Sequence, residues 1–150
     1  MRADQAVNPK EILASAKSIL LVDWPNAGKP RVLAEKGYDV FCYSPNGYTR
    51  AEIVDEYSDA DQKKMIPPMS GEKGYLVFFP LDGLPASADI VNIYRPEAEH
   101  DEIITKHALP LHSRVVWLQP PIVSEKTRAS ALGHGLAFIE DSDIAETARQ

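Results

Sequence analysis

Apolar and polar residues along the chain form blocks that are typical of an α/β protein. Runs of apolar residues, each ended by a polar residue, Gly or Pro, predict strands at 18–23, 38–43, 75–79, 88–94, 113–118 and 136–139. The first run is apolar from Ile19 to Val22, which is typical of a strand buried on both faces of a parallel sheet. Because helical stretches separate most of the runs, the pattern predicts a Rossmann-like, doubly wound parallel sheet of five to six strands in a single domain, 1–150, with the strand order 3-2-1-4-5-6.

Capping and stop signals place helices between these strands. Asn8 is a good cap and Pro9 suits the first helical position, so a helix is expected from there to Lys17. Gly37 fits the left-handed position that follows a helix. The other expected helices lie at 30–36, at 51–56 (an acidic, helix-like stretch within the least regular segment, 49–74), at 96–109, at 124–132, and from Asp141 or Ser142 to Ala148.

Composition is that of an ordinary globular protein with room for one core. A chain of 150 residues buries about two thirds of the surface that its unfolded form exposes, so it needs no disulfide or metal. The formal net charge of −6 argues against non-specific nucleic-acid binding, which depends on clustered Lys and Arg. The one cysteine, Cys42, lies in an apolar run and is expected to be buried. With no signal peptide and no apolar run of about 18 residues, the expected location is the cytoplasm.

The loop that follows the first strand is the best candidate for binding phosphate. In an open parallel sheet the ligand crevice lies beyond the carboxyl ends of the strands, where the strand order reverses. Asn26, Ala27 and Gly28 can expose successive amides, and the next helix adds its positive N-terminal end. Against this, Gly-x-Gly-x-x-Gly is absent, and the Asp23 carboxylate would repel a pyrophosphate over the first turn. A plain turn with a solvated Lys29 is an equal alternative.

Polar residues also follow the fourth and fifth strands. The Arg95 guanidinium could bind a phosphate through two hydrogen bonds, or it could be a surface group paired with Glu97 or Glu99. Gln119 comes directly after the fifth strand and is expected to face the ligand.

The two tryptophans are expected to differ in role. Trp117 lies among apolar residues and is assigned to the core. Trp24 lies on a loop, where a large indole often covers a cleft, as a platform for a purine or pantetheine would require.

The sequence contains no arrangement typical of catalysis. It has neither a Gly-x-Ser-x-Gly elbow nor a Walker-type Gly-Lys-Ser/Thr motif, since Gly28-Lys29 precedes Pro30. The acidic residues at 140–143 fit helix capping better than acid–base chemistry. We therefore expect neither an enzyme nor a metal site. The histidines lack metal-ligand spacing, and most are expected to be solvated or capping groups: His100, His107, His112 and His134.

Several segments together resemble a known family. The small, stand-alone CoA-binding domain proteins, which are related to the CoA-binding domain of succinyl-CoA synthetase, are similar to this chain at 19–25, 33–40, 88–96, 115–119 and 135–141. These segments cover most of 18–148 in the family's order. The chain departs from the family's pattern at Asp23 and Trp24, where members usually carry Gly and Ser.

The resemblance implies non-catalytic binding of coenzyme A or an acyl-CoA across the strand ends. It places phosphate at the first loop, the adenosine side near the end of the second strand, and the opposite wall of the cleft after the fourth strand. The implied site residues are Trp24, Pro25, Asn26, Ala27, Gly28, Lys29, Tyr43, Ser44, Pro45, Tyr94, Arg95, Pro96 and Gln119.

Two other functions stay open. An NAD(P)-binding redox enzyme or sensor would carry an acid after the second strand to bind the ribose hydroxyls, and Ser44-Pro45-Asn46 in that place counts against it. A ligand-less interaction module on the same fold would account for Asp23 and for Pro120-Pro121. The expected partner is a small nucleotide-type ligand, with a homodimer as an option; neither nucleic acid nor a membrane is expected.

Overall fold

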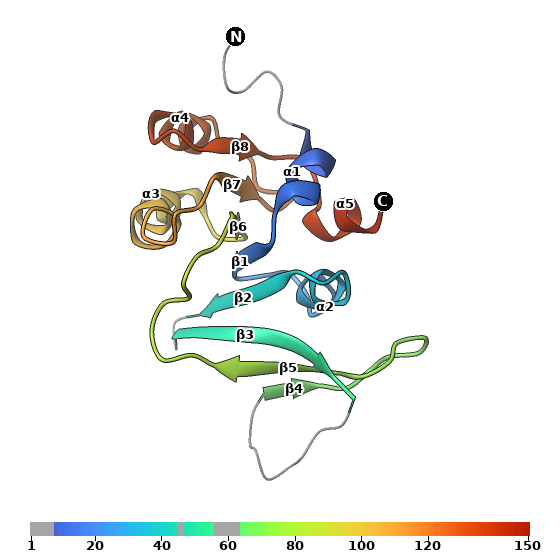
Figure 1. The fold of residues 1–150 in the computed structure, drawn as a ribbon. Coiled ribbons are helices and arrows are strands. Elements are labelled where there is room, and N and C mark those ends of the chain that lie inside the picture. The colour runs from blue at the N-terminus through green and yellow to red at the C-terminus, as the bar shows by residue number, and fades with distance from the viewer. Residues whose placement is uncertain (1–7, 45–46, 56–63) are drawn as a thin grey trace.

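The computed structural model describes residues 8–44, 47–55 and 64–150, which form one eight-stranded sheet with helices on both faces (Figure 1). Its strand order is β4-β5-β3-β2-β1-β6-β7-β8. The strands are β1 (Ser18–Val22), β2 (Asp39–Ser44), β3 (Gly47–Val54), β4 (Lys64–Ile66), β5 (Tyr75–Pro80), β6 (Ile90–Ile93), β7 (Val115–Leu118) and β8 (Ala137–Ile139). Pro45 of the expected site, Asn46 beside it and Glu56 of the acidic stretch lie outside the described residues.

Five neighbouring strands, β2-β1-β6-β7-β8, are parallel and form the doubly wound part of the sheet. β1 lies inside it, paired with β2 on one side and β6 on the other, and all five of its residues are buried. This burial on both faces is the physical reason for its unbroken apolar run. The predicted α/β class and doubly wound sheet are confirmed.

The remaining three strands form an antiparallel extension of the sheet, and two predictions about this region are wrong. β3 pairs antiparallel with β2, β5 with β3, and β4 with β5. The third strand expected along the chain is β5, and it was expected to pair with β2. In the structure β3 lies between them, so the simple order 3-2-1-4-5-6 is wrong.

The second correction concerns the acidic stretch at 51–56, because residues 51–54 belong to strand β3 and not to a helix. In a strand, successive side chains face opposite sides of the sheet. Ala51 is accordingly buried in the core, whereas the Arg50 guanidinium lies on the other side and pairs with Asp39 and Glu52. Hydrogen bonding to two neighbouring strands stabilises this segment, while an isolated helix of about six residues is marginal in water.

Helices cover both faces of the parallel strands (Figure 1). α1, α2 and α5 lie on one face, and α3 and α4 lie on the other. The helices are α1 (Pro9–Ser15), α2 (Gly28–Glu35), a 3-10 turn (Glu97–Glu99) leading into α3 (His100–Ile103) and a π-helical turn (Ile104–Ala108), α4 (Glu125–Gly133) and α5 (Ile144–Arg149).

The ends of the helices largely follow the predicted signals. The side chain of Asn8 accepts hydrogen bonds from the backbone N–H groups of Lys10 and Glu11 in α1, and the Ser124 hydroxyl accepts the Thr127 N–H in α4. Gly37 follows α2 with a φ of 93°. The cap of α5 is Asp143, not Asp141 or Ser142, because its carboxylate reaches two backbone N–H groups of the first turn.

The core has two parts, one on each face of the sheet. Trp117 is completely buried on the α1 and α5 face, as predicted, and Cys42 is 1% exposed in the same part. The part beneath α3 and α4 is built from residues of β1, β6 and β7 and of the helices that cover them. Within the described ranges, no helix is long and apolar enough to cross a membrane.

Candidate functional site

The strand order reverses between β1 and β6, so the ligand crevice is expected between the loops that follow their carboxyl ends. After β1 the chain passes to α2 on one face, and after β6 it passes to α3 on the opposite face (Figure 1). The loop from Asp23 to Ala27 therefore forms one wall, and the loop from Tyr94 to Pro96 forms the other. The Tyr94 N–H donates to the Val22 carbonyl at 3.0 Å and holds the second loop against the end of β1.

An ion pair joins the two walls. Arg95 Nη1 donates to Asp23 Oδ2 at 3.1 Å. The other carboxylate oxygen, Asp23 Oδ1, accepts the backbone N–H of Trp24 at 2.9 Å. Asp23 has a φ of 64°, in the left-handed region that residues other than glycine adopt infrequently. The residue that the sequence analysis took as repelling phosphate is thus bonded to two donors at the crevice.

A second carboxylate holds Arg95 from its own side of the crevice. Arg95 Nε and Nη2 donate to the two oxygens of Glu99 at 3.0 and 2.8 Å. Hydrogen bonds to Glu99 and then to Asp23 raise the pKa of Arg95, and the guanidinium in turn lowers the pKa of Glu99. His100 Nε2 lies 2.8 Å from the Arg95 carbonyl oxygen and holds the backbone. Of the two alternatives for Arg95, pairing with Glu99 is the arrangement in this structure.

The backbone N–H groups at the start of α2 differ in whether they are hydrogen-bonded. Two of them are bonded: the Gly28 N–H donates to Asn26 Oδ1 at 3.0 Å, and the Lys29 N–H donates to the Asn26 carbonyl at 3.2 Å. Among the described residues, the N–H groups of Asn26 and Ala27 have no acceptor. Because α2 begins at Gly28, these two amides lie at the positive end of its dipole. They are the groups in this loop best suited to bind an anion.

The two cations of α2 point away from this loop's amides. Lys29 Nζ bonds to Asp143 Oδ2 at 2.5 Å and ties α2 to the start of α5. Arg31 is 3% exposed, and its Nη2 donates to the Gly74 carbonyl at 2.9 Å. The structure therefore places both side chains in contacts between elements, so Lys29 is neither solvated nor directed at the loop.

Trp24 packs as part of the protein interior. Its ring stacks on Phe78 of β5, with the centroids 5.7 Å apart and the planes inclined by 12°. The indole belongs to the edge of the core on the α2 face of the sheet. This stacking differs from the expected lid, and it fixes the first loop to the antiparallel extension.

Gln119 lies inside the protein and not at the rim. Its side chain is 1% exposed, and its Oε1 accepts from Asn92 Nδ2 at 3.2 Å and from the Ile144 N–H at 3.3 Å. Asn92, itself 1% exposed on β6, was not singled out in the sequence. The available signal was the position of Asn92 within an apolar strand. Buried amides are almost always hydrogen-bonded, so this position indicated a polar partner inside the protein. The pair connects β6, β7 and the start of α5.

An aromatic cluster lies where β2 ends, at the position implied for adenosine. The Tyr43 ring contacts the rings of Tyr48 and His107, with centroids 5.0 and 4.3 Å away. The Tyr48 hydroxyl is hydrogen-bonded to His107 Nδ1. Burial, followed by the nearby Tyr43, raises the pKa of Tyr48 to about 12, while burial and the charge of Lys106 lower the pKa of His107. Sequence reasoning found Tyr43 here but missed its two partners, which come from β3 and the π-helical turn.

Two of the four histidines are buried, which corrects the expectation that most are solvated or capping groups. His100 is 1% exposed and His107 is 8% exposed, whereas His112 and His134 are exposed as predicted. His100 Nδ1 also lies 2.6 Å from the Thr127 hydroxyl, which joins α3 to α4. In the part of the chain that the structure describes, no cluster of His, Cys, Asp or Glu is arranged to hold a metal.

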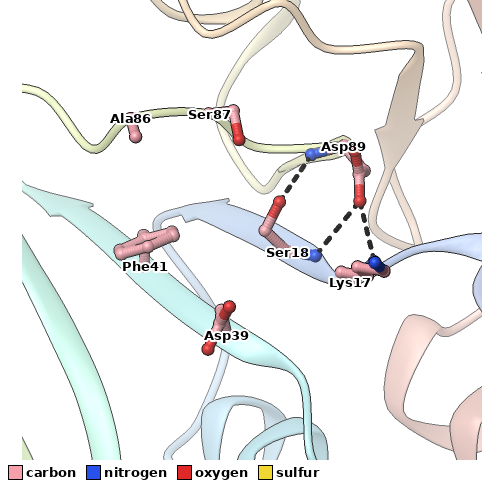
Figure 2. Close-up of a pocket in the computed structure, with 7 residues that line it drawn as sticks. All are labelled: Lys17, Ser18, Asp39, Phe41, Ala86, Ser87 and Asp89. Carbon is pink, nitrogen blue, oxygen red and sulfur yellow. Dashed lines mark hydrogen bonds between the residues drawn. The ribbon is translucent and has the colours of Figure 1, made fainter.

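A shallow hollow of about 280 Å³ lies at the opposite edge of the sheet, beside the amino ends of β1 and β2 (Figure 2). Asp89 Oδ2 accepts the backbone N–H groups of Lys17 and Ser18 at 2.7 and 3.3 Å, and the Asp89 N–H donates to the Ser18 hydroxyl at 3.0 Å. Asp39, also on the wall, pairs with Arg50. These polar groups satisfy one another, so we assign the hollow a structural role in joining strand ends.

The family assignment rests on residues 25–145, which match the family model described as a CoA binding domain. The chain belongs to this CoA-binding domain family. The matched segment contains most of both crevice walls and begins at Pro25, directly after Asp23 and Trp24.

Solved structures share the fold. Prb, described as a protein redesigned for binding, is 21% identical, with a TM-score of 0.63 over 96% of this chain and 91% of the other. A Thermus thermophilus protein is 21% identical, with a TM-score of 0.61 over 95% and 98%. A hypothetical protein from Pyrococcus horikoshii is 19% identical, with a TM-score of 0.63 over 96% and 92%. No curated protein matches the chain.

Proposed function

We propose that the protein binds coenzyme A or an acyl-CoA, without chemical change, in the crevice between the loops after β1 and β6. The family match supports the class of ligand. The observation that carries the location is the pair of N–H groups of Asn26 and Ala27 at the start of α2, which have no acceptor among the described residues and lie beside the point where the strand order reverses.

The pyrophosphate of the ligand would accept hydrogen bonds from these two amides. Such hydrogen bonds to a charged group are short and strong, and they need no cationic side chain. This suits the loop, since Lys29 is bonded to Asp143. The Arg95 guanidinium lies on the other wall, where it is held by Asp23 and Glu99.

The adenine end would lie near the close of β2. Tyr43 and Ser44 are half-buried there, and Tyr43 presents an aromatic ring of the kind that stacks on a purine. Tyr94 and the exposed Pro96 would line the opposite side of the crevice. Gln119 would act indirectly, by holding the ends of β6 and β7 in place.

Calorimetric titration of the purified protein with CoA, acetyl-CoA, NAD and ATP tests this proposal. We expect CoA and acetyl-CoA to bind at millimolar concentration or better and more tightly than NAD. Recovery of unchanged acetyl-CoA after incubation would support binding without chemistry. Absence of CoA binding at millimolar concentration would overturn the proposal.

One substitution probes the amides directly. Ala27 has a φ of −64° and is the second residue of a turn closed by the Lys29 N–H and the Asn26 carbonyl. Proline is favoured at that position of a type I turn, so Ala27→Pro should preserve the fold while removing one N–H. A hydrogen bond to a charged group contributes about 1.5–3 kcal/mol, so CoA affinity should fall about tenfold or more. Unchanged affinity with an unchanged melting temperature would contradict the placement of the pyrophosphate.

Pairing of the crevice cations favours a second candidate, an interaction module that has lost its ligand. Arg95 and Lys29 are both bonded to carboxylates of the protein itself. Under this candidate none of the four ligands would bind, and Ala27→Pro would have no effect on any titration.

A further inference from the structure

Two hydrogen-bond donors of the crevice converge on one carboxylate of the protein. The Trp24 N–H lies 2.9 Å from Asp23 Oδ1, and Arg95 Nη1 lies 3.1 Å from Asp23 Oδ2. A backbone amide and a guanidinium that share an anion form the kind of arrangement that binds a phosphate group. Here the anion they share is a side chain attached to the crevice wall.

The backbone of Asp23 is held in a conformation that its residue type seldom adopts. Its φ of 64° lies in the left-handed region, which destabilises residues other than glycine. Aspartate and asparagine tolerate this region because their short side chains can hydrogen-bond locally, as the bond to the Trp24 N–H shows. The carboxylate is thus directed back over the turn toward the crevice.

We propose that Asp23 is an internal competitor of the ligand: its carboxylate occupies the anion-binding position formed by the Trp24 N–H and the Arg95 guanidinium. This inference rests on the proposed function and assigns an affinity-setting residue to the same crevice. A phosphate group reaches these donors only when Asp23 leaves them. The ligand therefore binds more weakly, because the hydrogen bonds of Asp23 to both donors must first break.

Exposure makes this displacement feasible. The side chains of Arg95 and Asp23 are 41% and 46% exposed, so water can hydrogen-bond to the Asp23 carboxylate once it has moved away. Glu99 remains bonded to Arg95 through separate nitrogens and keeps the guanidinium at the crevice when Asp23 leaves. Because charges at this exposure are screened by salt, competition should be strongest at low ionic strength.

The experiment compares CoA affinity among matched variants by calorimetry at about 0.02 M and about 0.5 M salt, where the Debye length differs several-fold. Asp23→Asn removes the charge and suits the left-handed backbone, and Asp23→Gly frees both donors. Asp141→Asn is the control, because Asp141 is an exposed aspartate with the same φ of 64°, located after β8 at the far edge of the sheet. Each change is also made in an Arg95→Gln background.

We expect Asp23→Asn to bind CoA about three- to tenfold more tightly than the unmodified protein at low salt, and Asp23→Gly at least as tightly. The gain should shrink at high salt, be absent in Asp141→Asn, and disappear in the Arg95→Gln background, where no guanidinium is left to release. Equal affinity of the unmodified protein and both Asp23 variants would overturn the inference but leave CoA binding intact.

Two other outcomes also decide the matter. A gain that persists in the Arg95→Gln background would overturn the inference, because Asp23 would then act through general repulsion and not by occupying Arg95. If neither the unmodified protein nor any Asp23 variant binds CoA, the proposed function fails, and the inference fails with it. Thermal melts of each variant confirm that the proteins compared are folded.

Discussion

Replacing Lys29 by methionine tests whether this residue supports the fold or binds the ligand. Lys29→Met keeps an unbranched side chain of similar helix preference, one heavy atom shorter, and removes the charge. The structure bonds Lys29 Nζ to Asp143 Oδ2 at 2.5 Å, across the contact between α2 and α5. We therefore expect the substitution to lower stability and to leave CoA affinity nearly unchanged.

The magnitude follows from the burial of the pair. The Lys29 and Asp143 side chains are 17% and 27% exposed, so neither partner is well solvated if the other is removed. A hydrogen bond to a charged group contributes about 1.5–3 kcal/mol, and the residual exposure reduces this to about 1–2 kcal/mol. For a chain of this length each kcal/mol lowers the melting temperature by about 2–4 °C, so a decrease of about 2–8 °C is expected.

The pH dependence gives a second readout. Burial by itself raises the pKa of Asp143, but hydrogen bonds from Lys29, from the Glu146 N–H and from Gln119 outweigh it, and the pKa is lowered. A lowered carboxylate pKa stabilises the fold above the unfolded value of about 3.9, and this stabilisation is lost as the pH falls through the folded pKa. Without Lys29 the pKa of Asp143 should rise, so the loss of stability should be largest near neutral pH and smallest near pH 3.

Urea denaturation at pH 7, 5 and 3 measures these changes, and Lys106→Met is the matched control. Lys106 pairs with Glu102 at 2.7 Å, but both side chains are about two thirds exposed, at 67% and 64%, so its replacement should cost much less. Equal destabilisation by the two substitutions would refute the argument from burial. A tenfold loss of CoA affinity in Lys29→Met without loss of stability would return Lys29 to the role of a phosphate ligand.

Two further predictions concern a buried histidine and a constrained glycine. Because burial lowers the pKa of His107, this histidine binds a proton more readily in the unfolded chain, and the free energy of unfolding should decline as the pH falls below about 6.5. Urea midpoints at pH 7.5 and 5.5 measure this decline. It should be smaller in His107→Phe and unchanged in the control His134→Phe, where the replaced histidine is exposed. A Cβ on Gly74 would lie 2.8 Å from Ile53 Cγ2 and 3.0 Å from the Val54 carbonyl, whereas one on Gly83, whose φ is also positive, meets nothing within 4 Å. Gly74→Ala should therefore destabilise by at least about 1 kcal/mol more than Gly83→Ala, and equal urea midpoints for the two would contradict the contact argument.

Sequence patterns predicted the parallel part of the fold well because their signals are local. The apolar run of β1 and the capping side chains of Asn8 and Ser124 each act within a few residues. The prediction of a helix at 51–56 was wrong because it, too, used only local signals. The strand conformation of β3 is decided by hydrogen bonding to β2 and β5, which lie on either side of it.

At the candidate site, too, some features follow from local sequence and others only from packing. The sequence indicated the loops after β1 and β6 because strand ends and turn residues can be located along the chain. It could not show which charges remain free. Asp23 and Arg95 are 72 residues apart and Lys29 and Asp143 are 114 apart, yet each pair is joined by a hydrogen bond.

The sequence by itself therefore determined the α/β class and the parallel strands, and it indicated where a ligand is expected, since hydrophobic period, caps and turns depend on neighbouring residues. Only the tertiary structure decided that Arg95 is held by Asp23, that Lys29 is held by Asp143, and that Gln119 is buried. Partners of polar side chains depend on segments brought together by packing. The character of the anion site is thus a property of the folded chain, while its location can be predicted from the order of the strands.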